Sequence, residues 1–263
     1  MTRRKQKSPP VVLSIAGYDP SSGAGVTADI KTISAHGCYG ISCITALTVQ
    51  STRGVKRVVP VAPKIIADTL AALSADIKIA AVKIGMLGSA EAASAVANFL
   101  RRTRPEICVL DPILKSSSGA DLVSPKGLQL LETRLLPVAT VVTPNLAEAA
   151  ALTGIRVTGL KEMRAAALRL HSLGVPNVII TGGHMTTPID LVSADHGDEI
   201  TLLSGTQVQT KSTHGTGCAF STALACNLVS GMSLANAARK AKRFVYGALR
   251  HPPGIGKGTG PII

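Results

Sequence analysis

The chain lacks several features that would place it in special classes of protein. It has no tryptophan, only three phenylalanines and three tyrosines, and no C-x-x-C pair among its five cysteines. So few aromatic side chains leave little for stacking on unpaired bases, which argues against binding of single-stranded nucleic acid. An odd number of cysteines without paired spacing predicts reduced thiols and a cytoplasmic protein, not a secreted disulfide scaffold.

Hydrophobic runs are short, and positive charge is in excess but scattered. Lysine and arginine total 28 against 15 acidic residues, for a net charge of +13, and part of this excess lies in the tail 1–10. The apolar residues 11–16 that follow are too few for a signal peptide, and the uncharged stretch 214–238 is too rich in polar residues to span a membrane. We therefore expect a disordered basic tail, no membrane partner and no nucleic-acid partner.

Short β-branched runs alternate with helical patterns over residues 11–263. This alternation predicts a single α/β domain with a mostly parallel sheet and helices on both faces. Apolar residues recur with helical spacing over residues 26–33 and 160–170, and the runs 191–194 and 200–203 predict an antiparallel hairpin. The strands expected from these patterns span residues 11–16, 41–49, 79–84, 107–110, 140–142 and 177–181.

A glycine-rich segment leads into the uncharged stretch, which we interpret as a buried helix. Its sequence is Thr213-His214-Gly215-Thr216-Gly217-Cys218. Free amides at the start of a helix bind a phosphoryl group or a developing oxyanion, and the same field is expected to lower the pKa of the Cys218 thiol. Cys218 is therefore a candidate base, with a small cysteine packed in a buried helix as the alternative.

Asn145 and Glu148 follow the expected strand 140–142 and lie three residues apart. An amide and a carboxylate on one helix face suit Mg²⁺ beside phosphates. They suit a helix capping box equally well, with Asn145 as the cap and Glu148 at the third helical position. The sequence leaves both interpretations open.

Gly23-Ala24-Gly25 begins a match to the G-x-G-x-x-A pattern of dinucleotide-binding proteins. The loop before it is too long for the tight turn of that motif, and positions 43–53 hold no acidic residue for a ribose. We interpret the segment as a turn that opens a helix, with Asp29 near the helix start and facing whatever the loop encloses.

Ligands of open α/β sheets bind where the strands end, and the segments at these places are the most informative in the chain. They are 16–29, 38–40, 45–50, 83–87, 110–112, 143–149, 182–184, 213–218 and 258–261. Taken together, they resemble the hydroxymethylpyrimidine and phosphomethylpyrimidine kinases of thiamine biosynthesis, in the ribokinase-like superfamily. The likeness covers roughly residues 11–262.

The resemblance implies a ribokinase-like three-layer sandwich that uses ATP and Mg²⁺ and forms a homodimer. The implied reaction is phosphorylation of 4-amino-5-hydroxymethyl-2-methylpyrimidine and then of its monophosphate. Cys218 takes the place of the superfamily's usual aspartate base, beside Gly215, Thr216 and Gly217. The implied substrate-binding residues are Gly17, Asp29, Gln50, Met86 and Ile113. The implied ATP-binding residues are Asp111, Asn145, Thr181, Gly183 and Thr213, and the implied metal ligands are Glu148 and Asp111.

The chain departs from the family pattern at three places. Many members carry a phosphate-contacting lysine where Thr181 stands, and Lys115, Lys211 and Lys257 are the candidates to replace its charge. The other departures are Ser21-Ser22-Gly23, where Ser-Gly-Gly is frequent, and Ser117-Ser118-Gly119, where Lys-Ser-Gly is frequent.

Two other functions remain in view. A pyridoxal kinase of the same superfamily is the first alternative, because some of these enzymes also carry threonine before the paired glycines. Gln50 argues against it, since its amide matches the donor and acceptor pattern of an aminopyrimidine. A pyrimidine-binding regulatory protein without catalysis is the second alternative, and the missing lysine is its main support.

Overall fold

The computed structural model describes residues 8–115, 119, 121–183 and 185–263. Most of the predicted basic tail, residues 1–7, lies outside the described residues, as do Ser117, Ser118 and His184. The described chain is built on one nine-stranded sheet in the order β3-β2-β1-β4-β5-β6-β7-β8-β9. The strands are β1 (Val11–Tyr18), β2 (Tyr39–Ser51), β3 (Gly54–Pro60), β4 (Ile79–Ile84), β5 (Cys108–Leu110), β6 (Val141–Val142), β7 (Asn177–Ile180), β8 (Ile189–Ala194) and β9 (Glu199–Ser204).

The middle of the sheet is parallel and its edges are antiparallel. Strands β2, β1, β4, β5, β6 and β7 run in the same direction, whereas β3 pairs antiparallel with β2, and β8 and β9 form an antiparallel extension beyond β7. The mostly parallel sheet, the six predicted strands and the late hairpin are thus confirmed. The sequence patterns missed β3, because this edge strand is half-exposed and carries Lys56 and Arg57 in place of a buried alternation.

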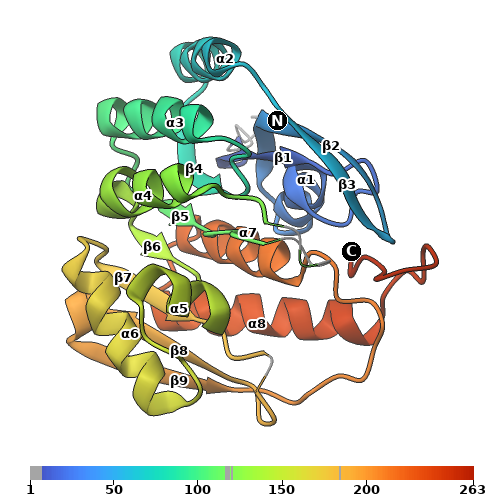
Figure 1. Cartoon of the computed structure of the whole chain (residues 1–263), viewed down its shortest axis with the longest axis vertical. Helices are drawn as coiled ribbons and strands as arrows, with labels where there is room; N and C mark the ends of the chain where they lie inside the picture. Colours follow the sequence, from blue (N-terminus) through green and yellow to red (C-terminus); the bar gives the residue numbers. More distant parts are fainter. Residues whose placement is uncertain (1–7, 116–118, 120, 184) are drawn as a thin grey trace, which may run out of the picture.

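Helices cover both faces of the sheet, so the predicted three layers are present (Figure 1). One face packs on α2, α3, α5 and α6, and the other on α1, α7 and α8. The helices are α1 (Gly25–Ala35), α2 (Pro63–Asp76), α3 (Ala90–Thr103), α4 (Pro125–Leu130), α5 (Leu146–Thr153), α6 (Leu160–Ser172), α7 (Thr216–Val229) and α8 (Leu234–Arg250), with the short turns η1 (Leu131–Leu135), η2 (Leu136–Val138) and η3 (Asp195–Gly197).

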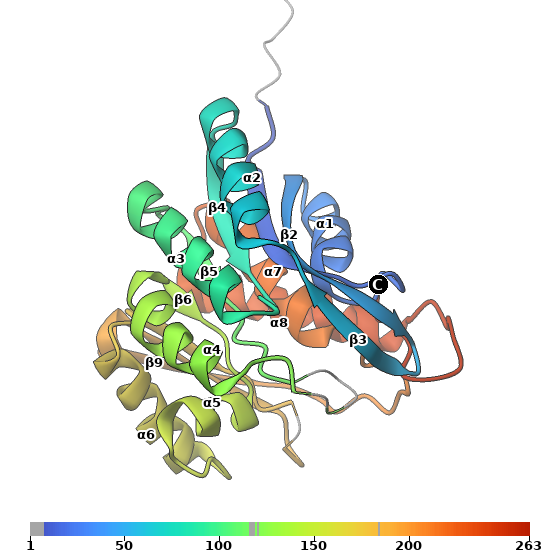
Figure 2. The same cartoon turned by 45° about the horizontal axis from the view of Figure 1, so that its top comes forward.

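The pleat of the central strands explains the two cores. Successive side chains of a strand point to opposite faces. In β1, Leu13 and Ile15 join the core beneath α3 and α6, whereas Val12 joins the core beneath α7 and α8. Figure 2 shows the sheet between the two helical layers.

Helix α7 is the most deeply placed helix, and its position confirms the buried helix expected from the uncharged stretch. Every residue from Cys218 to Asn227 is buried, because α7 packs between the sheet, α1 and α8. Within the described residues, no helix combines the length and the apolar character needed to cross a membrane. All five cysteines are free thiols, as predicted.

Candidate functional site

Helix α7 begins at the edge of the sheet where the parallel strands end. Gly215 precedes it with a φ of +83°, and a Cβ here would overlap the carbonyl of Gly23. The position therefore requires glycine for both its conformation and the close approach of the loop 19–25. Among the described residues no side chain caps this helix. The amides of Gly217 and Cys218 thus remain available to an anion.

Cys218 lies in the first turn of α7, as expected, and is buried. Its sulfur accepts a hydrogen bond from the Gly25 amide. Burial raises the pKa of the Cys218 thiol to about 12, and the positive charge of Lys83 offsets only part of this rise. The predicted lowering of this pKa is therefore wrong for the ligand-free protein, because the loss of solvation outweighs the field at the helix start.

Two buried carboxylates, Asp111 and Glu148, lie close to this helix start. Ser221 of α7 donates a hydrogen bond to Asp111 at 2.9 Å. Burial raises the pKa of both carboxyl groups, and the negative charge of Asp111 contributes to raising that of Glu148 to about 8. Asn145 and Glu148 also form a complete capping box, in which each side chain accepts the other's backbone N–H at 2.9 Å. The capping interpretation is confirmed, and the metal-binding role stays a prediction.

These carboxylates suit a cation that is only partly held by protein. In the described part of the chain, no three His, Cys, Asp or Glu side chains gather as a metal site. Asp111 and Glu148 nevertheless repel each other in a buried setting, and a dication would relieve that repulsion. Mg²⁺ keeps several waters and is often bound by one or two carboxylates plus substrate phosphates. The residues therefore fit Mg²⁺ carried with a nucleotide.

A fully buried ion pair lies on the sheet near Cys218. The Lys83 ammonium is 3.0 Å from both carboxylate oxygens of Asp29, and neither side chain is exposed. Asp29 also accepts hydrogen bonds from Ser14 at 2.6 Å and Thr222 at 2.7 Å. Burial works against the ammonium, but the attraction of Asp29 keeps the pKa of Lys83 above its usual value. Asp29 therefore has a structural role as the buried partner of Lys83. Its predicted contact with a substrate remains a prediction.

Sequence reasoning gave Lys83 no role, although a signal was present. Lys83 is the one charged residue in the apolar strand β4, Ile79–Ile84. Long charged side chains are almost never fully buried unless they are paired. A lysine within an apolar central strand therefore predicts a buried acidic partner, which the sequence alone does not identify.

Four of the five predicted substrate residues lie at the ends of four neighbouring strands, β2, β1, β4 and β5, whereas Asp29 lies in α1. A Cβ at Gly17 would overlap the terminal methyl of Met86, so these two residues are in contact. Gln50 lies near the end of β2 and is within hydrogen-bond distance of Thr48 and His214. Ile113 follows β5.

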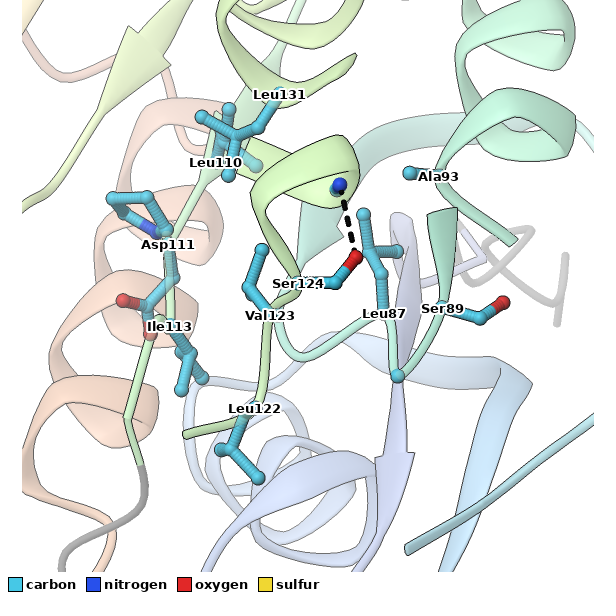
Figure 3. Close-up of a pocket in the computed structure, with 14 residues that line it drawn as sticks. Leu87, Ser89, Ala93, Leu110, Asp111, Ile113, Leu122, Val123, Ser124 and Leu131 are labelled. Atoms are coloured by element: carbon cyan, nitrogen blue, oxygen red, sulfur yellow. Dashed lines mark hydrogen bonds between the residues drawn. The ribbon is translucent and has the colours of Figure 1, made fainter. Parts of the chain in front are cut away.

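A hollow that is partly open to solvent joins Ile113 and Asp111 to residues that the sequence did not suggest (Figure 3). It lies between the β4–α3 loop, the end of β5 and the start of α4, which Ser124 caps by accepting the Gly127 N–H at 3.2 Å. Its lining is largely apolar and includes Leu87 of the strand-end segment 83–87, and the residues missed include Leu122, Val123 and Leu131. The sequence offered no signal for them, since they are ordinary loop and helix residues.

The predicted ATP-binding residues meet only in part. Thr181 pairs with Asn145 in a parallel bridge, so these two are neighbours. The Thr213 carbonyl accepts a hydrogen bond from the Thr216 hydroxyl at 2.7 Å, next to the start of α7. Gly183 is exposed, and among the described residues other than its chain neighbours none comes within 4 Å of the place of a Cβ. Of the candidate lysines, Lys115 forms an exposed ion pair with Asp121 at 3.2 Å.

Comparison with known proteins gives consistent results. The family model described as phosphomethylpyrimidine kinase matches residues 19–263. A hydroxymethylpyrimidine/phosphomethylpyrimidine kinase of Haemophilus influenzae is 43% identical over 255 residues, covering 95% of this chain and 94% of that protein. A thiamine biosynthesis bifunctional protein of Geobacter sulfurreducens is 41% identical over 251 residues, but the match spans 95% of this chain and only 51% of that longer protein.

Among solved structures, the pyridoxal kinase of Staphylococcus aureus in complex with pyridoxal is similar with a TM-score of 0.88 at 32% sequence identity. The match covers 97% of this chain and 93% of that one. The chain therefore shares its fold with a pyridoxal kinase, and the fold alone does not identify the substrate.

Proposed function

The chain belongs to the phosphomethylpyrimidine kinase family, and we propose that it transfers phosphoryl groups from ATP to 4-amino-5-hydroxymethyl-2-methylpyrimidine and then to its monophosphate. The observation that carries this proposal is the uncapped start of α7, with Cys218 in its first turn and Asp111 beside it. Phosphoryl transfer depends on positioning and charge stabilisation, which backbone amides at a helix start supply.

In the proposed reaction, the substrate hydroxyl attacks the terminal phosphorus of ATP as the bond to the ADP oxygen breaks. The Gly217 and Cys218 amides hold the transferring phosphoryl group. The hydroxyl proton passes to Cys218 in the small fraction of molecules whose thiol is ionised, and this thiolate is a strong base because burial raises the pKa of its conjugate thiol to about 12. Mg²⁺ bound with ATP supplies neutralisation of phosphate charge, and Asp111 and Glu148 are the residues that would hold it.

The product of the reaction tests the proposal directly. With ATP, Mg²⁺ and the hydroxymethylpyrimidine, we expect the monophosphate to form first and the pyrophosphate to follow, as chromatography of the reaction mixture would show. Pyridoxal is the comparison substrate, and we expect its turnover to be weak, because Gln50 provides a donor and an acceptor that a pyridine alcohol does not match. Faster phosphorylation of pyridoxal, or no phosphorylation of either alcohol, would reject the proposal.

Glu148 predicts a pH dependence of metal-assisted ATP binding. Its pKa is raised to about 8, so at lower pH the side chain is protonated in the free protein and a cation must displace that proton. We expect the Mg²⁺-dependent affinity for a non-hydrolysable ATP analogue to rise with pH and to level off above about pH 8, as calorimetric titration would measure. In the Glu148→Gln variant the rise should disappear while α5 stays capped, since glutamine also serves at this position. An unchanged pH profile would remove Glu148 from the proposed metal site.

We also propose that residues 11–263 act as one domain, in a cytoplasmic homodimer. Leu47, Val49 and Val59 are 48%, 44% and 44% exposed on the β2–β3 hairpin, and Leu47 pairs directly with Val59. An exposed apolar face on a sheet edge suits contact with a second copy of the chain. The free state of all five cysteines supports the cytoplasmic location.

A further inference from the structure

Two segments far apart in the sequence meet through a buried pair of side chains, Asp19 and His214. Asp19 directly follows β1 and is 3% exposed, and His214 lies two residues before α7 and is 7% exposed. His214 Nε2 lies 2.7 Å from Asp19 Oδ2. The hydrogen bonds from His214 and Ser21 keep the pKa of Asp19 below its usual value, although burial alone would raise it.

Asp19 is an ionised acceptor, and this settles which nitrogen of His214 carries hydrogen. Its Oδ1 accepts from the backbone N–H and hydroxyl of Ser21 at 2.8 and 2.7 Å, and its Oδ2 accepts from the Ala24 N–H at 3.0 Å. An ionised carboxylate can only accept hydrogen bonds. His214 Nε2 must therefore hold the hydrogen that lies between it and Asp19.

The same nitrogen also faces the side-chain amide of Gln50. Gln50 Nε2 lies 3.2 Å from His214 Nε2, and Gln50 Oε1 lies 3.1 Å from Thr48 Oγ1. In this orientation two N–H groups oppose each other. The Thr48 hydroxyl has one hydrogen but would have to donate two hydrogen bonds in this orientation. One goes to Gln50 Oε1 and the other to the Tyr18 carbonyl, which lies 2.9 Å away and can only accept.

A half-turn of the Gln50 amide resolves both conflicts. Gln50 Oε1 then shares, as the second acceptor of a three-centre hydrogen bond, the one hydrogen that His214 Nε2 donates to Asp19. Gln50 Nε2 donates to Thr48 Oγ1, and Thr48 donates its single hydrogen to the Tyr18 carbonyl. The amide oxygen and nitrogen of glutamine have nearly the same shape, so this exchange needs no further movement. Each polar group in the chain Asp19–His214–Gln50–Thr48 then has a compatible partner.

We propose that Asp19 and His214 are positioning residues that set the orientation of the Gln50 amide, and thereby make the site selective for an aminopyrimidine alcohol over a pyridine alcohol. This inference rests on the proposed function. With Oε1 held by His214, one amide hydrogen and one oxygen lone pair of Gln50 remain for a ligand, in a defined order. The amino group of an aminopyrimidine can then donate to the Gln50 oxygen while the neighbouring ring nitrogen accepts from the Gln50 amide hydrogen, and the reverse placement does not fit. A pyridine alcohol has no amino group next to a ring nitrogen, so it cannot form both bonds.

A double-mutant cycle tests whether His214 acts through Gln50. The measured quantity is the ratio of kcat/KM for the hydroxymethylpyrimidine to kcat/KM for pyridoxal. We expect His214→Leu to lower this ratio roughly tenfold, mainly through KM for the pyrimidine, as the loss of one oriented hydrogen bond predicts. In a Gln50→Leu background, the same substitution should lower the ratio no further. Equal losses in both backgrounds, or no loss in the wild-type background, would overturn the inference.

Conservative variants separate positioning from folding. His214→Gln places an amide N–H where Nε2–H stands and should restore most of the ratio, whereas a residue needed only for packing would not be rescued in this way. Asp19→Asn should lower the ratio in the same direction as His214→Leu, since a neutral amide no longer dictates which nitrogen of His214 carries hydrogen. Failure of both expectations would contradict the positioning role.

A measurement without substrate keeps this inference distinct from the proposed function. Nitrogen-15 NMR of the wild-type protein reports which imidazole nitrogen is protonated, and the His214→Gln variant identifies the His214 signal. We expect hydrogen on Nε2. An Nε2 without hydrogen would overturn the inference whichever alcohol the enzyme accepts, whereas failure to phosphorylate the pyrimidine with Nε2 protonated would overturn the proposed function alone.

Discussion

Replacement of Cys218 by serine is expected to lower kcat for the hydroxymethylpyrimidine by a factor of about 10²–10⁴, the usual contribution of a positioned general base. A serine hydroxyl in the same place is a far weaker acid than a thiol, so its anion is not accessible at working pH. ATP binding should persist, because the amides at the start of α7 do not depend on the side chain at this position. Steady-state kinetics and titration with a non-hydrolysable ATP analogue would measure the two effects.

Cys226 provides the matched control for this prediction. It is a buried thiol on the same helix, two turns further on, and Cys226→Ser should leave kcat within a few-fold of wild type. Because the pKa of Cys218 is raised to about 12, the thiolate fraction grows about tenfold per pH unit below that value, and wild-type kcat should rise with pH. Unchanged turnover in Cys218→Ser would remove this residue from the proposed role.

Replacement of Lys83 by methionine is expected to destabilise the fold by about 3–5 kcal/mol, the cost of leaving one member of a buried ion pair without its partner. Methionine matches the length of the lysine stem, so packing is largely kept. The carboxylate of Asp29, which has no exposed surface, would retain only the hydroxyl groups of Ser14 and Thr222. Urea unfolding followed by circular dichroism would measure the change.

Two further variants isolate the electrostatic cause. In Asp29→Asn combined with Lys83→Met the unpaired charge is absent, and we expect part of the lost stability to return. Lys64→Met removes the ammonium of an exposed pair with Asp68, in which the two side chains are 84% and 64% exposed, and it should hardly move the unfolding midpoint. A double variant less stable than the Lys83→Met variant would contradict the electrostatic explanation.

Much of the fold followed from local patterns. The strand at residues 79–84 and the helix from Leu160 have the same limits in the sequence patterns and in the structure, within one or two residues. Their periodicity reflects one buried face, which is a property of neighbouring residues. The edge strand β3 gave no such signal, because none of its residues is buried and its pairing with β2 is not encoded in a local apolar pattern.

The features of the site also separate into those that follow from nearby residues and those that depend on tertiary packing. The place of Cys218 in a helix start and the capping box of Asn145 and Glu148 were predictable, because each depends on residues a few positions apart. The sign of the Cys218 pKa shift was not, since it depends on how completely other segments exclude water from the thiol.

The layered α/β architecture, the helix that carries the candidate base and the family of the chain follow from the residues alone. The pairing of buried charges does not: Lys83 meets Asp29 across 54 positions, and Asp19 meets His214 across 195, and only the folded structure reveals these partners. Hydrophobic periodicity is a property of adjacent residues, whereas desolvation and hydrogen bonding at a buried site depend on chain segments that come together on folding.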